Sequence, residues 1–402
     1  MGRCQLSDIV IVATMDTKAA SARYLAALVA SAGGRPLLVD ASCLREPDLE
    51  VDIGRDEVAR AAGLQGAADL VQFDRGERVA AMGRGVAAVV AGLPRLGGAL
   101  FLGGNQGAAI AAMAAGALPA ALPAVLVTTI PPAARSPELA RFHVVQLTAD
   151  LVGPPNPITA PTLHEAVSAL GLHPANMPLP ALGRRGLAGI SSLGNTEPAA
   201  LAVAALLEEA GFTPVVFHAS GPGGERLEQL AATGQLSHIV EVAPHELVAE
   251  VLGEDLYRCR QPRLWPHPGV SRIFLPGSLD YYCLGPEKSI PAQLLDRPRV
   301  MHNPLNANVM TSSEERVRLA MVAGERLGRA DAAAVVPMHG WSQAGAEGMP
   351  LFDLASVREF AEELGRRLPT RRLEAHINAP AVTQAVGELI GALWTQRSAS
   401  IV

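Results

Sequence analysis

The first 42 residues alternate between short apolar runs and a helical pattern. The run DIVIVA (8–13) has five successive apolar residues, as is typical of a strand buried on both faces of a sheet. In AASARYLAALVASAGG (19–34), Ala, Leu and Val recur at helical spacing, and the final glycines suit the end of a helix. RPLLVDAS (35–42) predicts a second strand. The chain is therefore expected to begin with a strand–helix–strand unit.

The same pattern returns in the second half of the chain. Residues 187–220 align with residues 9–42 over 34 positions without a gap, at a constant offset of 178. Any two such units share part of this pattern, so the few identities do not prove a duplication. An ungapped match through both strands and the helix nevertheless predicts two similar domains. The alignment pairs Asp40 with His218, so both domains are expected to end this strand on a polar, proton-exchanging residue.

Strand and helix patterns continue to alternate after each repeat. In the first half, residues 97–104 and 123–129 predict strands, and the segment between them predicts a helix. Alternation of this kind is typical of mainly parallel sheets with helices on both faces. The strand segments predicted in the second half are SHIVEV (237–242), VSRIFLPG (270–277), RPRVMHN (297–303), AAAVVPMHG (332–340) and RRLEAHIN (371–378).

The sequence therefore predicts an α/β fold with two Rossmann-like domains, related by apparent duplication. The proline-rich stretches 153–162 and 173–186 interrupt regular structure and bracket a connecting helix. A boundary near residue 184 gives a nucleotide-binding type of domain over 1–184. It gives a second domain with histidine-rich strand ends over 185–402.

Composition narrows the expected partners and location. The net charge of −6, without a basic cluster, disfavours nucleic acid as a partner. No segment stays apolar for the about 18 residues that a membrane-spanning helix needs. The four cysteines form no C-x-x-C pair, and the N-terminus has no signal-peptide pattern. A cytoplasmic protein with reduced thiols is expected.

Two loops follow predicted strands of the first domain, where ligands of parallel sheets bind. TMDTK (14–18) offers hydroxyls, a carboxylate and an ammonium at a helix start, which suits a phosphate with Mg²⁺. GGNQG (103–107) has glycines that let the backbone approach a ligand. The alternative is an ordinary helix cap with a solvated lysine. The sequence contains neither G-x-G-x-x-G nor G-x-x-x-x-G-K-[ST], which disfavours a nicotinamide enzyme and a P-loop. The candidate cofactor-binding residues are Thr14, Met15, Asp16, Thr17, Lys18, Gly103, Gly104, Asn105 and Gly107.

Histidines gather at the predicted strand ends of the second domain. Four of the ten histidines stand there, and a glycine loop (221–224) follows the first of them. Such imidazoles could act as general acids or bases, or bind a divalent metal, and no spacing separates these alternatives. The candidate catalytic residues are His218, His302, Asp280, His339 and His376. The candidate substrate-binding residues are Ser220, Gly221, Gly223, Gly224, Arg263, Asn303, Ser342 and Asn378.

Several of these segments resemble the Tm-1-like (UPF0261) family. They are ATMDTK, FHASGPGGERLEQL, PGSLD, MHNPLNANVMTSSEE, PMHGWSQAGAEGMPLFD and HINAP, in this order from about residue 9 to 390. The resemblance implies two Rossmann-like domains, ATP with Mg²⁺ in the first domain, and self-association into a homo-oligomer. A further C-terminal barrel domain is found in a member of the family, and this protein is expected to lack it. The second-domain positions that match are His218, Gly221, Gly223, Gly224, Glu228, Arg263, Asp280, His302, Asn303, Pro304, Glu314, Glu315, Ser342, His376 and Asn378.

Departures from the family are concentrated in the first domain. Asn105 and the alanines at 108–109 replace a serine and a threonine of relatives, and Ala124 replaces a lysine. Because phosphate sites use such groups, ATP binding is expected to be weaker than in relatives. The sequence thus leads to one hypothesis and one alternative. The hypothesis is a protein that binds a nucleotide or another anionic small molecule, with acid/base or metal-assisted hydrolysis or carbon–carbon cleavage in a cleft between the domains. The alternative is a non-catalytic ligand-binding or protein-interaction protein with a regulatory or inhibitory role.

Overall fold

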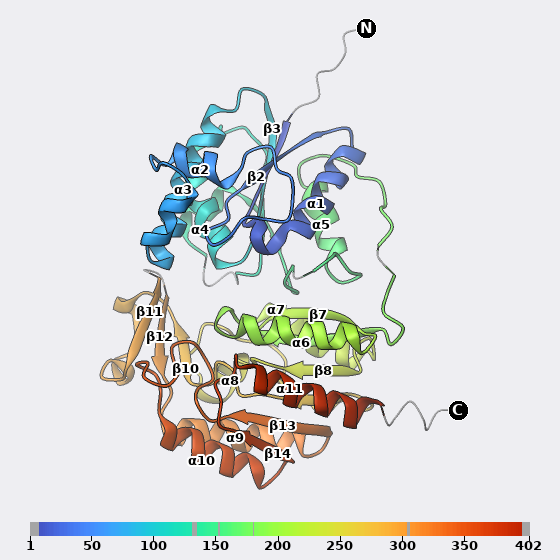
Figure 1. Ribbon diagram of the computed structural model, residues 1–402, viewed down its shortest axis with the longest axis vertical. Helices are drawn as coiled ribbons and strands as arrows, with labels where there is room; N and C mark the ends of the chain where they lie inside the picture. Colours follow the sequence, from blue (N-terminus) through green and yellow to red (C-terminus); the bar gives the residue numbers. More distant parts are fainter. Residues whose placement is uncertain (1–7, 131–134, 152, 180, 304–305, 396–402) are drawn as a thin grey trace. The chain divides into compact units, whose positions relative to one another are not determined.

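The computed structural model describes residues 8–130, 135–151, 153–179, 181–303 and 306–395, except for the side chains of Arg75, His302, Asn303 and Thr395. The chain divides into two compact units, Met1–Ala181 and Leu182–Val402 (Figure 1). Each unit is an α/β domain whose main sheet is parallel and flanked by helices, so the predicted fold class is confirmed. Within the described residues, no helix is both long and apolar enough to cross a membrane.

The first unit is built around a five-stranded parallel sheet in the order β2-β1-β3-β4-β5. Its two faces are covered by different helices, and each face has its own apolar core, one packed under α1 and α5 and the other under α2, α3 and α4 (Figure 1). The strands are β1 (Asp8–Ala13), β2 (Arg35–Asp40), β3 (Leu96–Leu102), β4 (Ala124–Thr128) and β5 (His143–Gln146), and the helices are α1 (Met15–Ser31), α2 (Arg55–Ala61), α3 (Arg75–Gly92), α4 (Asn105–Ala114) and α5 (Ala160–Ser168).

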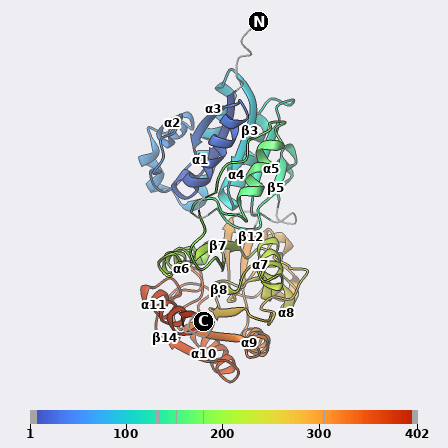
Figure 2. The same cartoon turned by 90° about the vertical axis from the view of Figure 1, so that its right-hand side faces the viewer.

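The second unit contains a six-stranded parallel sheet in the order β14-β13-β9-β8-β6-β7. Helices α6 and α11 cover one face, and α7 to α10 cover the other (Figure 2). The strands are β6 (Leu187–Ser192), β7 (Thr213–His218), β8 (His238–Glu241), β9 (Ser271–Phe274), β13 (Asp331–Pro337) and β14 (Thr370–Leu373), and the helices are α6 (Glu197–Glu209), α7 (Pro222–Ala232), α8 (Glu246–Leu252), α9 (Ser313–Leu327), α10 (Leu354–Gly365) and α11 (Pro380–Leu389), followed by a π-helical turn, η8 (Ile390–Thr395).

A second, three-stranded antiparallel sheet belongs to the same unit. Its order is β10-β12-β11, with β10 (Tyr281–Leu284), β12 (Asn306–Met310) and the edge strand β11 (Arg299–Asn303). The segment RPRVMHN is thus a strand, but it does not join the parallel sheet. The carboxyl ends of parallel strands lie at one edge of their sheet. His302 and Asn303 lie on an antiparallel strand, so this rule does not place them at that edge.

The two aligned segments form corresponding strand–helix–strand units, β1-α1-β2 and β6-α6-β7. In both sheets the first strand lies between the second and the third, which is a doubly wound order. The strand registers differ by one residue, because Asp8 pairs with Arg35 whereas Leu187 pairs with Thr213. A shared order of this kind is common among α/β folds, so a duplication does not follow from it.

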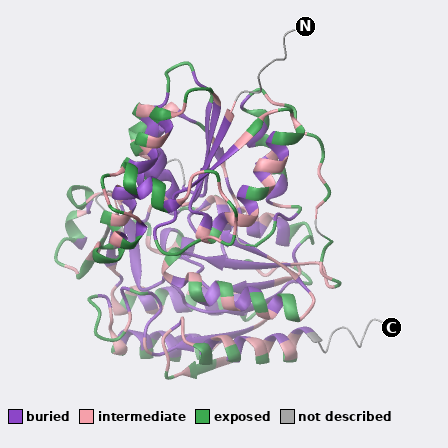
Figure 3. Cartoon of the chain, turned by 45° about the horizontal axis from the view of Figure 1, so that its top comes forward, coloured by how far each residue is buried: buried purple, intermediate pink, exposed green. Residues whose placement is uncertain are grey.

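Buried apolar strands between half-exposed helices account for both cores. The middle strands of each sheet are buried along most of their length, whereas the helices turn exposed residues outward (Figure 3). This is the pattern expected when period-3.6 helices cover continuous apolar strands. Polar groups therefore lie at the strand ends and in the loops that follow them.

Candidate functional site

The carboxyl ends of β1 and β3 border the topological switch point of the first unit. The chain leaves β1 for α1 on one face of the sheet and leaves β3 for α4 on the other face. Ligands of doubly wound sheets bind in the crevice at this point. Both predicted loops, 14–18 and 103–107, lie at this edge.

The start of α1 is already satisfied by the protein. The Met15 N–H donates to Asp40 Oδ1 at 3.3 Å. The Asp16 N–H donates to Ser42 Oγ at 2.8 Å. The next two N–H groups both donate to the Thr14 carbonyl, at 3.2 and 3.1 Å. The first turn of α1 therefore offers a ligand no N–H group without a rearrangement.

Asp40 acts as an internal anion at this helix start. It is fully buried at the end of β2, and its Oδ1 accepts hydrogen bonds from the Met15 N–H and from the N–H and hydroxyl of Ser42. Its Oδ2 has no hydrogen-bond partner among the described residues. Burial raises the pKa of the Asp40 carboxyl, against the hydrogen bonds from Ser42 that lower it.

The start of α4 is open, in contrast. Its N-cap is Gly104, which supplies no side-chain cap, and the first backbone bond of the helix runs from the Ala108 N–H to the Gly104 carbonyl at 2.9 Å. Within the described part of the chain, the N–H groups of Asn105 and Gly107 have no acceptor. A Cβ on Gly107 would lie 2.9 Å from the Leu102 carbonyl oxygen, so glycine is required for the helix to pack this close to β3. Two backbone donors and the positive end of the helix dipole thus lie together at this helix start.

Two cationic side chains lie at the same edge of the sheet. Lys18 Nζ is 2.6 Å from Asp150 Oδ1, and the lysine side chain is 8% exposed. Arg135, which the sequence analysis did not single out, donates from Nη2 to Gln146 Oε1 at 2.6 Å, and burial lowers its pKa. Cations and backbone N–H groups are the donors that bind phosphate oxygens, so Lys18, Arg135 and the N–H groups of Asn105 and Gly107 are the candidates for a phosphate at this edge. Among the described residues, no group of three His, Cys, Asp or Glu side chains is placed to hold a metal ion.

In the second unit, the glycine loop is occupied by a carboxylate of the protein itself. The N–H groups of Gly221 and Gly224 donate to Glu246 Oε1, at 3.3 and 3.0 Å. A Cβ on Gly224 would overlap this carboxylate, and one on Gly223 would overlap the carbonyl of His218. The loop lacks side chains because its own backbone and Glu246 approach it closely. The anion position at the start of α7 is thus filled by Glu246.

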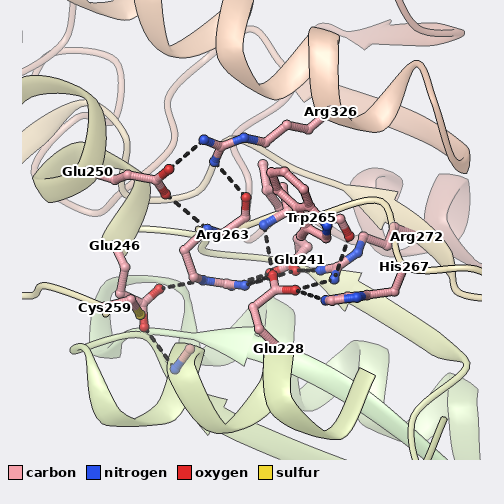
Figure 4. A network of polar contacts seen from close by, with 12 residues as sticks. Glu228, Glu241, Glu246, Glu250, Cys259, Arg263, Trp265, His267, Arg272 and Arg326 are labelled. Atoms are coloured by element: carbon pink, nitrogen blue, oxygen red, sulfur yellow. Dashed lines mark hydrogen bonds and ion pairs between the residues drawn. The ribbon is translucent and has the colours of Figure 1, made fainter. Parts of the chain in front are cut away.

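Glu246 belongs to a buried network of three glutamates and two arginines. Arg263 donates from Nη1 to Glu228 at 2.5 Å, from Nη2 to Glu241 at 2.7 Å, and from Nε to Glu246 at 3.2 Å (Figure 4). Arg272 bridges Glu228 and Glu241 from the other side. All five side chains are at most 1% exposed. Arg263, predicted to bind substrate, has its guanidinium enclosed by these carboxylates.

The network's carboxyls differ in ionisation: burial raises the pKa of Glu246 against the Arg263 charge, whereas the charges around Glu228 outweigh its burial. Burial opposes the charge of Glu228, but Arg272 and the other partners lower the pKa of its carboxyl to about 2. With three carboxylates and two guanidiniums, the third carboxylate relies on the N–H groups at the start of α7. His267 Nε2 lies 3.3 Å from Glu228 Oε2 and lines the network on its exposed side.

One group of the remaining predicted residues lies at the carboxyl ends of β9, β13 and β14. There the Ser342 hydroxyl donates to Asp280 Oδ2 at 2.6 Å, and His376 Nε2 bonds the Ser342 carbonyl at 3.0 Å. His376 Nδ1 accepts the Asn378 N–H at 3.2 Å, so both ring nitrogens are engaged. Because His376 contacts the carbonyl and not the hydroxyl of Ser342, the three residues do not form a Ser-His-Asp triad.

The other predicted histidines lie elsewhere. His218 ends the edge strand β7, three strands from β9, and its carbonyl accepts the Ser220 N–H at 2.8 Å. At about 4.8 Å per strand spacing, β7 and β9 are roughly 14 Å apart, too far for Asp280 to orient His218 directly. His339 is 39% exposed and lies near two surface glutamates. The side chains of His302 and Asn303, on β11, lie outside the described residues.

The sequence analysis missed His245, a fully buried histidine after β8. Its Nδ1 is 2.5 Å from the Ser278 carbonyl, and its Nε2 is 3.1 Å from Asp255 Oδ2. Burial opposes its charge, but the Asp255 carboxylate raises the pKa of His245 well above its usual value. The sequence places it at a helix start, HELVAEVLG, where nothing indicates burial.

The family motif SSEE is explained by a helix cap. Ser312 Oγ accepts the Glu315 N–H at 3.3 Å, and Glu315 Oε2 accepts the Ser312 N–H at 2.8 Å. This reciprocal pair is a capping box at the start of α9. Glu315 also pairs with Arg297 at 2.5 Å, so its role in this structure is local.

Two doubly wound units, each with polar groups at the carboxyl edge of a parallel sheet, define a two-domain α/β protein. The chain belongs to the uncharacterised protein family UPF0261. Residues 7–171 match its N-terminal domain and residues 185–394 match its C-terminal domain. The resemblance found in the sequence motifs is thereby confirmed.

Relatives match over most of the chain. A UPF0261 protein of Rhizobium meliloti is 30% identical over 396 residues, which cover 94% of this chain and 97% of the relative. A UPF0261 protein of Brucella suis is 29% identical over 390 residues, 92% of each chain. The ToMV susceptible protein tm-1(GCR26) of Solanum lycopersicum is 24% identical over 304 residues, which cover 72% of this chain and 40% of the tomato protein.

Proposed function

We propose that this chain binds a small phosphorylated molecule, such as a nucleotide, at the carboxyl edge of the first unit's sheet. The open start of α4 carries the proposal, because the N–H groups of Asn105 and Gly107 have no acceptor within the described residues. Lys18 supplies a largely buried cation at the same edge, and Arg135 supplies a second one. Asp150, the partner of Lys18, would face the cation that accompanies a phosphate, such as Mg²⁺.

The proposal divides the predicted loops by role. The loop 103–107 contacts the phosphate through its backbone, whereas the loop 14–18 contributes Lys18 and keeps its own N–H groups bonded to Asp40, Ser42 and Thr14. Backbone N–H groups do not depend on side-chain identity. The replacement of family hydroxyls by Asn105 and alanines at 108–109 therefore leaves the central donors in place.

Replacing Lys18 with glutamine is expected to weaken binding of ATP in the presence of Mg²⁺ about tenfold. One charge-assisted contact contributes about 1.5–3 kcal/mol, and each 1.4 kcal/mol is tenfold in affinity. Isothermal titration calorimetry of the full chain measures the change. Lys288→Gln is the matched control, because Lys18 and Lys288 are the two lysines of the sequence and Lys288 is exposed.

Two results would contradict this proposal. One is equal affinity for the wild type and Lys18→Gln. The other is an absence of ATP, ADP and pyrophosphate binding to the wild type at millimolar concentration. An equal loss in Lys288→Gln would point to a general charge effect and would also contradict a specific contact.

A further inference from the structure

Strand β14 forms an open edge of the six-stranded parallel sheet. It pairs with β13 on one side and, among the described residues, with no strand on the other. The Ala334 N–H of β13 donates to the Pro369 carbonyl at 2.8 Å, which sets the phase of the pairing. Because alternate residues of a strand bond the same neighbour, the N–H and C=O groups of Thr370 and Arg372 point away from β13. The edge thus offers two donors and two acceptors at strand spacing.

An open hollow of about 630 Å³ lies beside this edge. It is lined by residues 365–370 together with Glu362 and Arg372, so the end of α10 and the start of β14 form its walls. Its volume is that of a pocket for a small ligand or for a few side chains of a partner. A Cβ on Gly365 would lie 3.9 Å from Arg372 Nη2, which places this guanidinium beside the end of α10. The hollow therefore borders the same two residues whose backbone groups are unpaired.

The arginines of the hollow differ in their partners. Arg366 and Arg367 both pair with Glu363, which neutralises part of their charge. Arg372 is exposed, and within the described residues its guanidinium has neither a hydrogen bond nor an ion pair. Three arginines face the carboxylates of Glu362 and Glu363, so one positive charge is left without a counter-charge. A carboxylate is the natural partner for a guanidinium in this position.

The charges also discriminate among the segments that could pair with β14. Arg371 lies between the two outward residues and pairs with Glu388 of α11. A second copy of this chain, paired antiparallel across a two-fold axis at Arg371, would place two arginines directly opposite each other, which is unfavourable. An acidic segment would instead bring a carboxylate to Arg372 while its backbone extends the sheet.

We propose that the β14 edge binds an extended acidic segment of a partner protein, which adds a strand to the sheet and places one carboxylate beside Arg372. The N–H and C=O groups of Thr370 and Arg372 supply the backbone hydrogen bonds, and the guanidinium selects for acidic side chains. This surface lies in the second unit, and the proposal is independent of the phosphate site proposed for the first unit.

Isothermal titration calorimetry of the full chain with the peptide acetyl-TEVEVET-amide tests this proposal. The wild type is expected to bind it, but to bind neither acetyl-TKVKVKT-amide, which has the opposite charge, nor acetyl-TEPEPET-amide, which keeps the charge and lacks two N–H groups. Arg372→Gln is expected to weaken binding about tenfold, because it removes a charge-assisted contact. Arg358→Gln is the matched control, since Arg358 is an exposed arginine of α10 outside the hollow, and it is expected to bind like the wild type.

A second substitution tests the added strand. Thr370→Pro removes an N–H group that takes no part in the pairing with β13, so the fold is expected to be retained and peptide binding to fall about fivefold. Lys18→Gln is expected to leave peptide binding unchanged, which separates this site from the phosphate site. Unchanged affinity in Arg372→Gln, or equal binding of the proline peptide, would overturn the proposal. An absence of binding to the acidic peptide would also overturn it, and would show that the arginines only protect the edge against pairing.

Discussion

Replacing Arg263 with methionine is expected to lower the free energy of unfolding of the second unit by about 3–5 kcal/mol, as for other broken buried ion pairs. The guanidinium contacts Glu228, Glu241 and Glu246, all of them buried. Methionine fills a similar volume but leaves three carboxylates with Arg272 as their remaining guanidinium partner. The loss is therefore mostly the cost of uncompensated charge.

The same prediction has a defined pH dependence. The pKa of Glu228 is about 2 in the folded protein, below the value of 4.5 for an exposed glutamate. A carboxyl with a lowered folded pKa stabilises the protein above its unfolded pKa and loses this contribution as pH falls. The Glu228 contribution to wild-type stability is therefore expected to be full above pH 4.5 and to be lost as pH falls towards 2, and the difference between the wild type and Arg263→Met shrinks with it.

Urea unfolding followed by tryptophan fluorescence measures this effect in the correct unit. Trp265, Trp341 and Trp394 are the three tryptophans, and all lie in the second unit. Arg299→Met is the control, because its pair with Glu287 is largely exposed and such pairs contribute about 0–1 kcal/mol. A loss for Arg263→Met no larger than that of the control would show that the network is not an ionised one.

Glu246→Ala is expected to cause a loss of similar size, about 3–5 kcal/mol, and formate is expected to restore part of it. The substitution leaves the N–H groups of Gly221 and Gly224 and the Nε of Arg263 without their acceptor. It also opens a space of carboxylate size at the start of α7. Formate in that space would accept the same hydrogen bonds.

Thermal unfolding with formate, compared with chloride at equal ionic strength, measures the rescue. At ten times its dissociation constant, formate would contribute about 1.4 kcal/mol and raise the midpoint of Glu246→Ala by about 3–6 °C. The wild type, with its own carboxylate in place, is expected to show no specific response. A variant that responds equally to both salts would contradict the assignment of Glu246 as an internal anion.

The strand pattern and the strand-end rule predicted much of this structure. Parallel strands and their order of helices follow from continuous apolar runs and 3.6-residue periodicity, which are local properties of the sequence. For the same reason the loops 14–18 and 103–107 were placed at one edge, and Asp280, Ser342, His376 and Asn378 at another. The strand-end rule assumed that the strand before His302 is parallel to its neighbours, but β11 pairs antiparallel with β12. The sequence pattern of one strand does not say whether its partner is parallel or antiparallel.

Local sequence patterns could not predict which carboxylates of the protein accept hydrogen bonds from the first N–H groups of a helix. Glu246 lies 22 residues after Gly224, at the start of α8, where a glutamate ordinarily indicates a favourable helix dipole. Glu228, Arg263 and Arg272 likewise have the composition of a solvated face. Their burial depends on how α7, β8 and β9 pack, which local sequence patterns do not describe. From those patterns alone, the glycine loop is expected to be open and Asp40 is expected to be a polar residue at a strand end.

Amide chemical shifts of the full chain labelled with ¹⁵N-glycine, titrated with pyrophosphate, test the central claim most directly. That claim assigns the available anion-binding backbone to the start of α4 and the occupied one to the start of α7. The account predicts that Gly104 and Gly107 shift with saturable dependence on pyrophosphate while Gly221 and Gly224 stay in place. Shifts at Gly221 and Gly224 without shifts at Gly104 and Gly107 would contradict it.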